Sequence, residues 1–166
     1  MQIAFKTDRL LLTALSLDDA IFIFELVNTA EWIQFIGNRK VEDLGDAKAY
    51  IQKLIDNPTI NYWVVKLQND GQSIGVITLL KRDYLEHPDI GFAFLPRFSH
   101  QGYAFEASSV VLKKLLESTD YQYILAATLP ENANSIKLLE KLGLHFEKEF
   151  LRNNDTLRLY STPAKT

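Results

Sequence analysis

The segment from Arg97 to Ala104 has the residue types and order that best suit the binding of an anionic ligand. It reads Arg-Phe-Ser-His-Gln-Gly-Tyr-Ala and joins a segment that alternates like a strand to one with helical periodicity. A helix start leaves backbone N–H groups unpaired beside the positive end of the helix dipole. The small residues Gly102 and Ala104 let a ligand approach the backbone closely. The pattern predicts a phosphate-binding loop, although a junction that binds nothing has the same pattern.

The composition of the 166-residue chain excludes several other kinds of chemistry. Without cysteine there is no disulfide, thiolate zinc site or cysteine nucleophile. His87 and His145 lack metal-ligand spacing, so we expect no metal. A net charge of -3 argues against a nucleic-acid partner. The segment Met1–Leu12 lacks the apolar core of a signal peptide, and no apolar run is long enough to span a membrane. We therefore expect a cytoplasmic protein without a membrane partner.

Hydrophobic periodicity predicts one α/β domain over residues 1–166, with helices first, then an antiparallel meander, then a βαβαβ unit. The expected strands are Arg9–Ala14, Tyr62–Gln68, Ser73–Leu80, Asp89–Leu95, Tyr121–Thr128, Phe146–Leu151 and Thr156–Ser161. The expected helices are Ile21–Val27, Ala30–Phe35, Ala47–Ile55, the segment from Gly102 to Ser118, and Pro130–Leu142.

Local signals support these boundaries. The sequence Ser16-Leu17-Asp18-Asp19 is typical of a helix-opening cap. A hairpin is indicated at Asn69-Asp70-Gly71, and a second tight turn at Asn153-Asn154-Asp155. Gly143 stands where a left-handed residue would close the last helix.

Four blocks of the sequence, in order, resemble the GNAT superfamily of acetyl-CoA-dependent N-acetyltransferases, and in particular its ribosomal-protein N-terminal acetyltransferase branch. They are Thr7-Asp8-Arg9-Leu10-Leu11-Leu12, Asp89-Ile90-Gly91-Phe92, Gly102-Tyr103-Ala104-Phe105-Glu106-Ala107, and Asn132-Ala133-Asn134-Ser135 with Glu140-Lys141-Leu142-Gly143. The resemblance implies a central, mixed but mostly antiparallel sheet that is splayed in the middle and flanked by helices. It also implies that the pantetheine of acetyl-CoA lies in the gap between the strands at Asp89–Leu95 and Tyr121–Thr128.

The same resemblance implies which residues hold the cofactor. Backbone groups at Phe92 and Phe94 would pair with pantetheine, the loop would bind the pyrophosphate, and the start of the last helix would contact pantetheine. The residues concerned in the loop and helix are His100, Gln101, Gly102, Tyr103, Ala104, Asn132 and Asn134. Small side chains at Gly91 and Ala93 would leave room for the cofactor, or would simply pack under a helix. Ser99 and His100 depart from the family, which has Arg or Gln and then Gly at these positions.

Catalytic roles also follow from the resemblance. Ser135 matches the proton donor for the leaving thiolate, and Asp89 matches a Glu that often serves as base. Each has a plainer alternative, because Asn132, Asn134 and Ser135 are ordinary helix caps and an exposed carboxylate before a strand is usually only solvated. Glu106 and Glu131 are weaker candidates for the base, since acids in a first helical turn favour the dipole.

The expected activity is acetyl transfer from acetyl-CoA to a primary amine by direct attack in a ternary complex, since the chain has neither cysteine nor a GxSxG motif. The acceptor would be a protein N-terminal amine or a small-molecule amine, and the enzyme a monomer or homodimer. Trp32, Phe35 and Ile36 would line the acceptor site or pack in the core. One alternative is an inactive acyl-CoA-binding sensor. Another is a nucleotide-binding protein, which the absence of a GxxxxGK[ST] motif disfavours.

Overall fold

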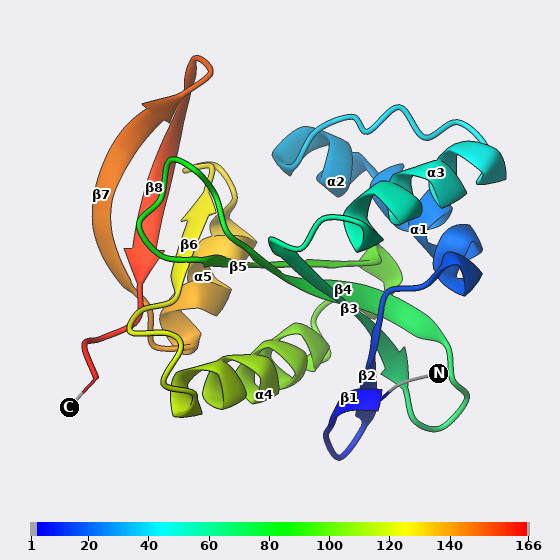
Figure 1. Ribbon diagram of the computed structural model, residues 1–166, viewed down its shortest axis with the longest axis horizontal. Helices are drawn as coiled ribbons and strands as arrows, with labels where there is room; N and C mark the ends of the chain where they lie inside the picture. Colours follow the sequence, from blue (N-terminus) through cyan, green and yellow to red (C-terminus); the bar gives the residue numbers. More distant parts are fainter. Residues whose placement is uncertain (1–2, 166) are drawn as a thin grey trace.

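The computed structural model describes residues 3–165 as one eight-stranded sheet with helices on both faces (Figure 1). The sheet order is β1-β2-β3-β4-β5-β6-β8-β7. The strands are β1 (Ile3–Lys6), β2 (Leu10–Ala14), β3 (Ile60–Leu67), β4 (Ser73–Leu80), β5 (Asp89–Phe94), β6 (Leu125–Thr128), β7 (His145–Arg152) and β8 (Asp155–Ser161). The helices are α1 (Ala20–Val27), α2 (Ala30–Phe35), α3 (Leu44–Ile55), α4 (Tyr103–Glu117) and α5 (Ala133–Lys141), with short 3-10 turns at η1 (Leu17–Asp19) and η2 (Pro96–Phe98).

Alternation along the strands gives the sheet two buried faces. Neighbours such as Val64 and Val65 on β3 point to opposite sides, and each joins a different apolar cluster. One cluster packs under α4 and α5, and the other packs under α1, α2 and α3. The two helical layers therefore separate the chain into an α4–α5 face and an α1–α3 face of the same sheet (Figure 1).

The sheet is interrupted in its middle. β5 and β6 run parallel and pair only at Asp89 and Leu125, where the Leu125 amide donates to the Pro88 carbonyl at 2.9 Å. All other strand pairs are antiparallel and continue for several residues. The two strands diverge beyond Asp89 (Figure 1). This confirms the splayed, mostly antiparallel sheet that the family resemblance implies.

Most predicted elements are confirmed to within a few residues, and so are the turn signals. Ser16 and Asp19 form a reciprocal capping box. Gly71 and Gly143 have φ of 73° and 94°, the left-handed conformations expected at the hairpin and the helix end. No helix within residues 3–165 is long and apolar enough to cross a membrane.

One strand was not predicted, and two elements begin several residues later than expected. β1 was not expected; it is only four residues long and packs Phe5 edge-on against Trp63, with ring centroids 5.4 Å apart. β6 begins at Leu125 rather than Tyr121, because the Ile124 amide donates to the Thr162 hydroxyl outside the ladder. α5 begins at Ala133 rather than Pro130, because Asn132 caps it.

Candidate active site

On the open side of β5, the backbone groups of two predicted residues pair with no other strand within residues 3–165. The Leu95 amide donates to the Ile74 carbonyl at 2.9 Å, toward β4. Successive residues of a strand direct their N–H and C=O groups to alternate sides. Phe92 and Phe94 therefore direct theirs away from β4, to the side where β6 has diverged. An extended amide-containing ligand could pair there as an additional strand does.

Small residues on β5 have a packing reason. A side chain at Gly91 would place its Cβ 2.7 Å from Thr78 Oγ1, so the neighbouring strand already occupies that space. Ala93 packs against the apolar cluster of the α1–α3 face. These contacts support the alternative that both residues are small because β4 and the helices pack closely on them, and the room for a cofactor stays a prediction.

The loop between β5 and α4 presents a row of free amides. Across residues 100–105, no backbone carbonyl or side chain of the described chain accepts from these N–H groups, and α4 has no side-chain cap. Gly102 has φ of 81°, in the left-handed region. His100 has φ of 61°, a conformation that costs a non-glycine residue about 1–2 kcal/mol. The predicted loop residues from His100 to Ala104 are thus together at the α4 N-terminus, where an anion is favoured.

Arg9 holds this loop in place through contacts with two of its residues, Gln101 and Tyr103. The sequence alone did not reveal this role. Arg9 Nη1 donates to the Gln101 carbonyl at 3.0 Å, and its guanidinium lies 4.3 Å from the centre of the Tyr103 ring. Its Nε donates to Glu106 Oε1 at 2.8 Å, while the Thr7 hydroxyl and the Arg9 amide donate to Oε2. The first and third blocks of the family resemblance are therefore one hydrogen-bonded network. Residues about 97 positions apart give no local pattern that reveals it.

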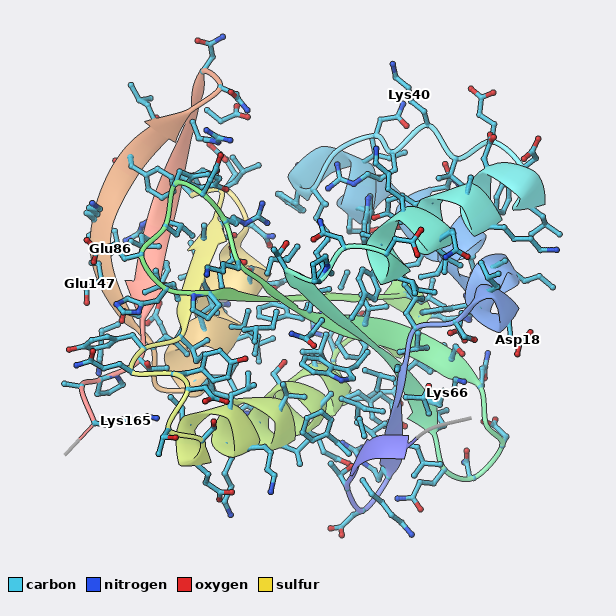
Figure 2. The ribbon with its side chains drawn as sticks, viewed as in Figure 1. Asp18, Lys40, Lys66, Glu86, Glu147 and Lys165 are labelled. Atoms are coloured by element: carbon cyan, nitrogen blue, oxygen red, sulfur yellow. The ribbon has the colours of Figure 1, made fainter. Side chains whose placement is uncertain are left out.

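Asp89 is buried at the point where the sheet splits. Its side chain is 5% exposed, and Oδ2 accepts from Arg82 Nε at 2.9 Å. Oδ1 is buried and has no partner within residues 3–165. Burial raises the pKa of Asp89 above its ordinary value, and Arg82 opposes that rise only in part. The alternative that Asp89 is an exposed, solvated carboxylate was therefore wrong. Asp89 differs in this from charged side chains such as Lys40 and Lys165, which extend from the surface (Figure 2).

The start of α5 has a structural role that leaves other groups free. Asn132 Oδ1 accepts from the Ser135 amide at 3.2 Å, which is the cap that the plainer interpretation expects. The Asn132 Nδ2 group and the Ser135 hydroxyl make no hydrogen bond to described residues. Asn134 is exposed, and Ser135 is half-buried. These groups follow β6 in the chain, at the start of a helix that packs on the α4–α5 face.

The three candidates for the acceptor site, Trp32, Phe35 and Ile36, differ in how deeply they are buried. Trp32 is 5% exposed and belongs to the apolar cluster of the α1–α3 face, so it packs in the core. Phe35 is half-buried, whereas Ile36 is exposed. Asp89 shares this α1–α3 face with Gly91 and Ala93, because the three alternate with Ile90, Phe92 and Phe94. Candidate base and candidate acid thus approach the gap from different faces of the sheet.

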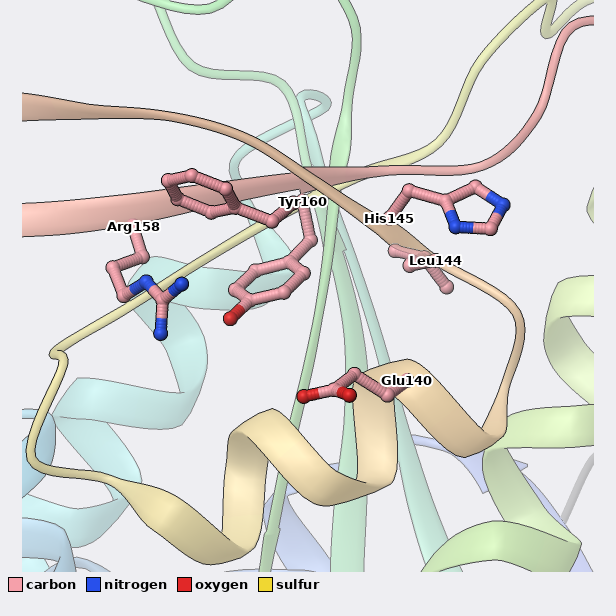
Figure 3. A pocket seen from close by; sticks show the side chains of 6 residues that line it. Glu140, Leu144, His145, Arg158 and Tyr160 are labelled. Carbon is pink, nitrogen blue, oxygen red and sulfur yellow. The ribbon is translucent and has the colours of Figure 1, made fainter.

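Two hollows lie outside the gap. One of about 590 Å³ starts at the loop and runs along α4; it is lined by Arg9, Gly102, Phe105, Glu106, Ser109, Val110 and Lys113. The other, of about 420 Å³, lies between α5 and the β7–β8 hairpin. Its walls include Glu140, Arg158 and Tyr160, whose polar ends point into the same space (Figure 3). No group of His, Cys, Asp and Glu within residues 3–165 is arranged to hold a metal ion.

Known proteins match this architecture over most of the chain. A family model described as an acetyltransferase (GNAT) domain matches residues 9–145. An N-acetyltransferase of Bacillus subtilis, YnaD, is 28% identical over 145 residues, which are 87% of this chain and 84% of that protein. A GNAT-family acetyltransferase from Bacillus anthracis superposes with a TM-score of 0.80 at 25% identity, covering 97% of each chain.

A ribosomal L7/L12 α-N-protein acetyltransferase in complex with coenzyme A has the same fold. Its TM-score is 0.83 at 16% identity, covering 96% of this chain and 97% of that one. The family model spans far more than half of the sequence and includes the loop, Asp89 and the start of α5. The chain therefore belongs to the GNAT acetyltransferase family.

Proposed function

We propose that this acetyltransferase transfers the acetyl group of acetyl-CoA directly to a primary amine, with both substrates bound at the gap between β5 and β6. The observation that carries the proposal is the convergence at one break in the sheet of an unpaired strand edge, a row of free amides and a buried carboxylate. The buried Asp89 oxygen is costly to leave without a partner, and the three features together suit a ligand with amides, phosphates and an adjacent amine.

The cofactor would be held almost entirely by backbone groups. Phe92 and Phe94 would pair with the pantetheine amides along the β5 edge, and Asn132 or Asn134 would meet pantetheine from α5. The amides from His100 to Ala104 would receive the pyrophosphate. Because amides can bind phosphate whatever side chain they carry, Ser99 and His100 need not prevent binding. The Arg9 contacts would keep the loop in its binding conformation.

Asp89 would act as the base. The attacking nitrogen forms a bond to the acetyl carbonyl carbon, and the carbon–sulfur bond breaks. Asp89 Oδ1 accepts the proton that the nitrogen loses, directly or through one water, since Asp is one methylene shorter than the usual Glu. A raised pKa makes Asp89 a stronger base than an ordinary aspartate, provided that it is ionised when the amine binds.

Ser135 would complete the proton balance on the other side. Its hydroxyl gives a proton to the departing thiolate and takes one back from solvent, while Asp89 releases to solvent the proton that it took from the amine. The acid would act from the α4–α5 face and the base from the α1–α3 face. This division places the two proton transfers on opposite sides of the thioester. No covalent enzyme intermediate is needed, in line with a chain that lacks cysteine.

The acceptor would be a protein N-terminal amine or a small-molecule amine. An α-amine titrates near 7.7–8.0 and a lysine near 10.4, a difference of roughly 2.5 units or about 3.5 kcal/mol of deprotonation cost. The α-amine therefore demands less of the base than the lysine amine does. We therefore expect α-amines to be better acceptors than ε-amines of the same size.

A thiol-release screen tests the proposal directly. Acetyl-CoA and a panel of peptides, amino acids, polyamines and aminoglycosides are mixed with the enzyme, and free CoA thiol is followed colorimetrically. The protein contributes no background, because it has no cysteine. Turnover with at least one amine is expected. If CoA binds but no amine releases thiol above the uncatalysed rate, the chain is an acyl-CoA sensor and the proposal is wrong.

A further inference from the structure

We propose that Arg82 is a positioning residue that holds Asp89 ionised and in place, so that it controls the pH range in which the enzyme works. The inference rests on the proposed function, because it assigns Asp89 as the base. Arg82 lies in the loop of residues 81–88 between β4 and β5. Its Nε donates to Asp89 Oδ2 at 2.9 Å, and the contact engages only one carboxylate oxygen.

That geometry leaves the other oxygen available. Oδ1 is buried and unpartnered within the described chain, while Oδ2 is fixed by Arg82. A carboxylate anchored at one oxygen cannot rotate freely, so its second oxygen keeps a constant direction for a proton. Arg82 thus supplies both orientation and charge without needing to touch the substrates itself.

Arg82 is the charged group that meets Asp89 at this position. The strand neighbours that pair with Asp89 are apolar: Leu80 on β4 and Leu125 on β6. His87, in the same loop, lies against Tyr123 with ring centroids 5.1 Å apart. No other titratable side chain within residues 3–165 has a recorded hydrogen bond or ion pair with Asp89.

The loop is itself fastened to the β7–β8 hairpin, beside which it runs in Figure 1. Arg82 lies 5.9 Å from the centre of the Tyr84 ring, and Arg152 lies 4.0 Å from the same centre on the hairpin side. Phe150 packs on Tyr84 with ring centroids 6.1 Å apart. Tyr84 therefore fixes the loop to the hairpin, and the loop fixes the direction from which Arg82 reaches Asp89.

Two opposing effects act on Asp89, and Arg82 is responsible for one of them. Burial disfavours the charged carboxylate, and the neighbouring cation favours it. Removing the cation leaves burial unopposed, so Asp89 would hold its proton to a higher pH. An opposite charge in contact commonly shifts a carboxyl pKa by about 1–3 units. A protonated Asp89 cannot accept the proton of the amine.

The test compares the pH dependence of thiol release for wild type, Arg82→Met, Arg82→Lys and Lys81→Met. Lys81 is the matched control, since it is an exposed cation next to Arg82 in the same loop. In Arg82→Met we expect the acid limb of kcat/KM to move up by about 1–3 pH units. CoA affinity, measured by calorimetry, should stay within about twofold of wild type. Arg82→Lys should keep the acid limb close to its wild-type position, because lysine restores the positive charge. Lys81→Met should behave as wild type.

The outcomes separate this inference from the proposed function. A wild-type enzyme that releases thiol, together with an unmoved acid limb in Arg82→Met, would overturn the role of Arg82 and leave the function standing. A wild-type enzyme that acetylates no amine would instead remove the proposed function. An equal shift in Lys81→Met would show a general charge effect and also overturn the inference. If Arg82→Met does not fold, Arg82→Gln provides the same comparison.

Discussion

Two carboxylates near the gap each meet an arginine, yet they respond in opposite ways. Asp89 contacts Arg82 at 2.9 Å through one oxygen, and burial raises its pKa. Glu106 contacts Arg9 at 2.8 Å, and both of its oxygens accept hydrogen bonds. Burial also acts to raise the pKa of Glu106, but the hydrogen bonds from Thr7 and Arg9 outweigh it and the pKa falls.

The difference shows that an ion pair alone does not define a role. A carboxylate with both oxygens engaged in hydrogen bonds is stabilised as an anion and becomes an anchor, as at Glu106. A carboxylate that is buried with a free oxygen is a better proton acceptor, as at Asp89.

Replacing the base should have the largest effect. In Asp89→Asn we expect kcat/KM for thiol release to fall by about 10²–10⁴-fold, the usual contribution of a general base. The CoA dissociation constant should be unchanged, because the loop is untouched. Glu106→Gln is the comparison and should keep a wild-type kcat once CoA is saturating. Equal losses of kcat in the two variants would abolish the distinction between base and anchor.

The loop that Glu106 anchors should be the next most sensitive place. Gly102→Val puts a β-branched residue at φ of 81°, and the amides at the α4 start would be displaced. We expect CoA affinity to fall at least about 100-fold, which corresponds to losing two charge-assisted hydrogen bonds of about 1.5 kcal/mol each. Isothermal titration calorimetry measures this loss.

Gly71→Val is the matched control for the loop variant. Gly71 has φ of 73° in an exposed hairpin turn and has no neighbour within 4 Å of the added Cβ. It should lose similar stability without losing CoA affinity. Unchanged CoA affinity in Gly102→Val would remove the loop from the cofactor site.

Stability should depend on pH in opposite directions for the two acids. Glu106, with a lowered folded pKa, stabilises the fold above its ordinary pKa, and this contribution is lost as pH falls through the folded value. Glu106→Gln should therefore cost about 1 kcal/mol at pH 7, and this cost should shrink toward pH 3. Asp89, with a raised pKa, disfavours the folded state increasingly as pH rises through its titration range.

Urea unfolding at several pH values measures both trends. Relative to wild type, Asp89→Asn should become more stable as pH rises, while Glu106→Gln becomes less stable. Parallel pH trends for the two variants would contradict the assignment of opposite environments.

His100 should give the smallest effect. His100→Gly relieves a left-handed conformation but adds freedom to the unfolded chain, so we expect a net stabilisation below about 1 kcal/mol. CoA affinity should change by less than about threefold, since contact would be through the amide. A large loss of affinity in calorimetry would show instead that the imidazole itself contacts the phosphates.

The sequence predicted the elements well where the signal was local. The hairpin at Gly71, the cap at Ser16 and the left-handed Gly143 are decided by neighbours in the chain, and all three are confirmed. β1 escaped notice because four residues carry too little alternation to identify a strand. The start of β6 was misplaced, since the pairing of Ile124 depends on Thr162, which is 38 residues away.

The candidate site residues lie on or beside the strands and helices that the sequence predicts, but their contacts could not be predicted. The catalytic and cofactor roles remain predictions, whereas the surroundings of Asp89 differ from those expected. Its burial depends on three strands meeting, and its contact with Arg82 depends on how the 81–88 loop folds back. The Arg9 network likewise joins distant segments. Such long-range effects produce no periodicity in the sequence.

The link from Thr7 and Arg9 to Glu106 also sets an order of events during synthesis. Thr7 and Arg9 leave the ribosome before their partner Glu106, which follows almost a hundred positions later. Contacts of such separation form late, because closing a long loop costs entropy before the contact can offset it. The cofactor loop would therefore acquire its final shape only after both halves of the protein exist, which makes CoA binding a sensitive reporter of complete folding.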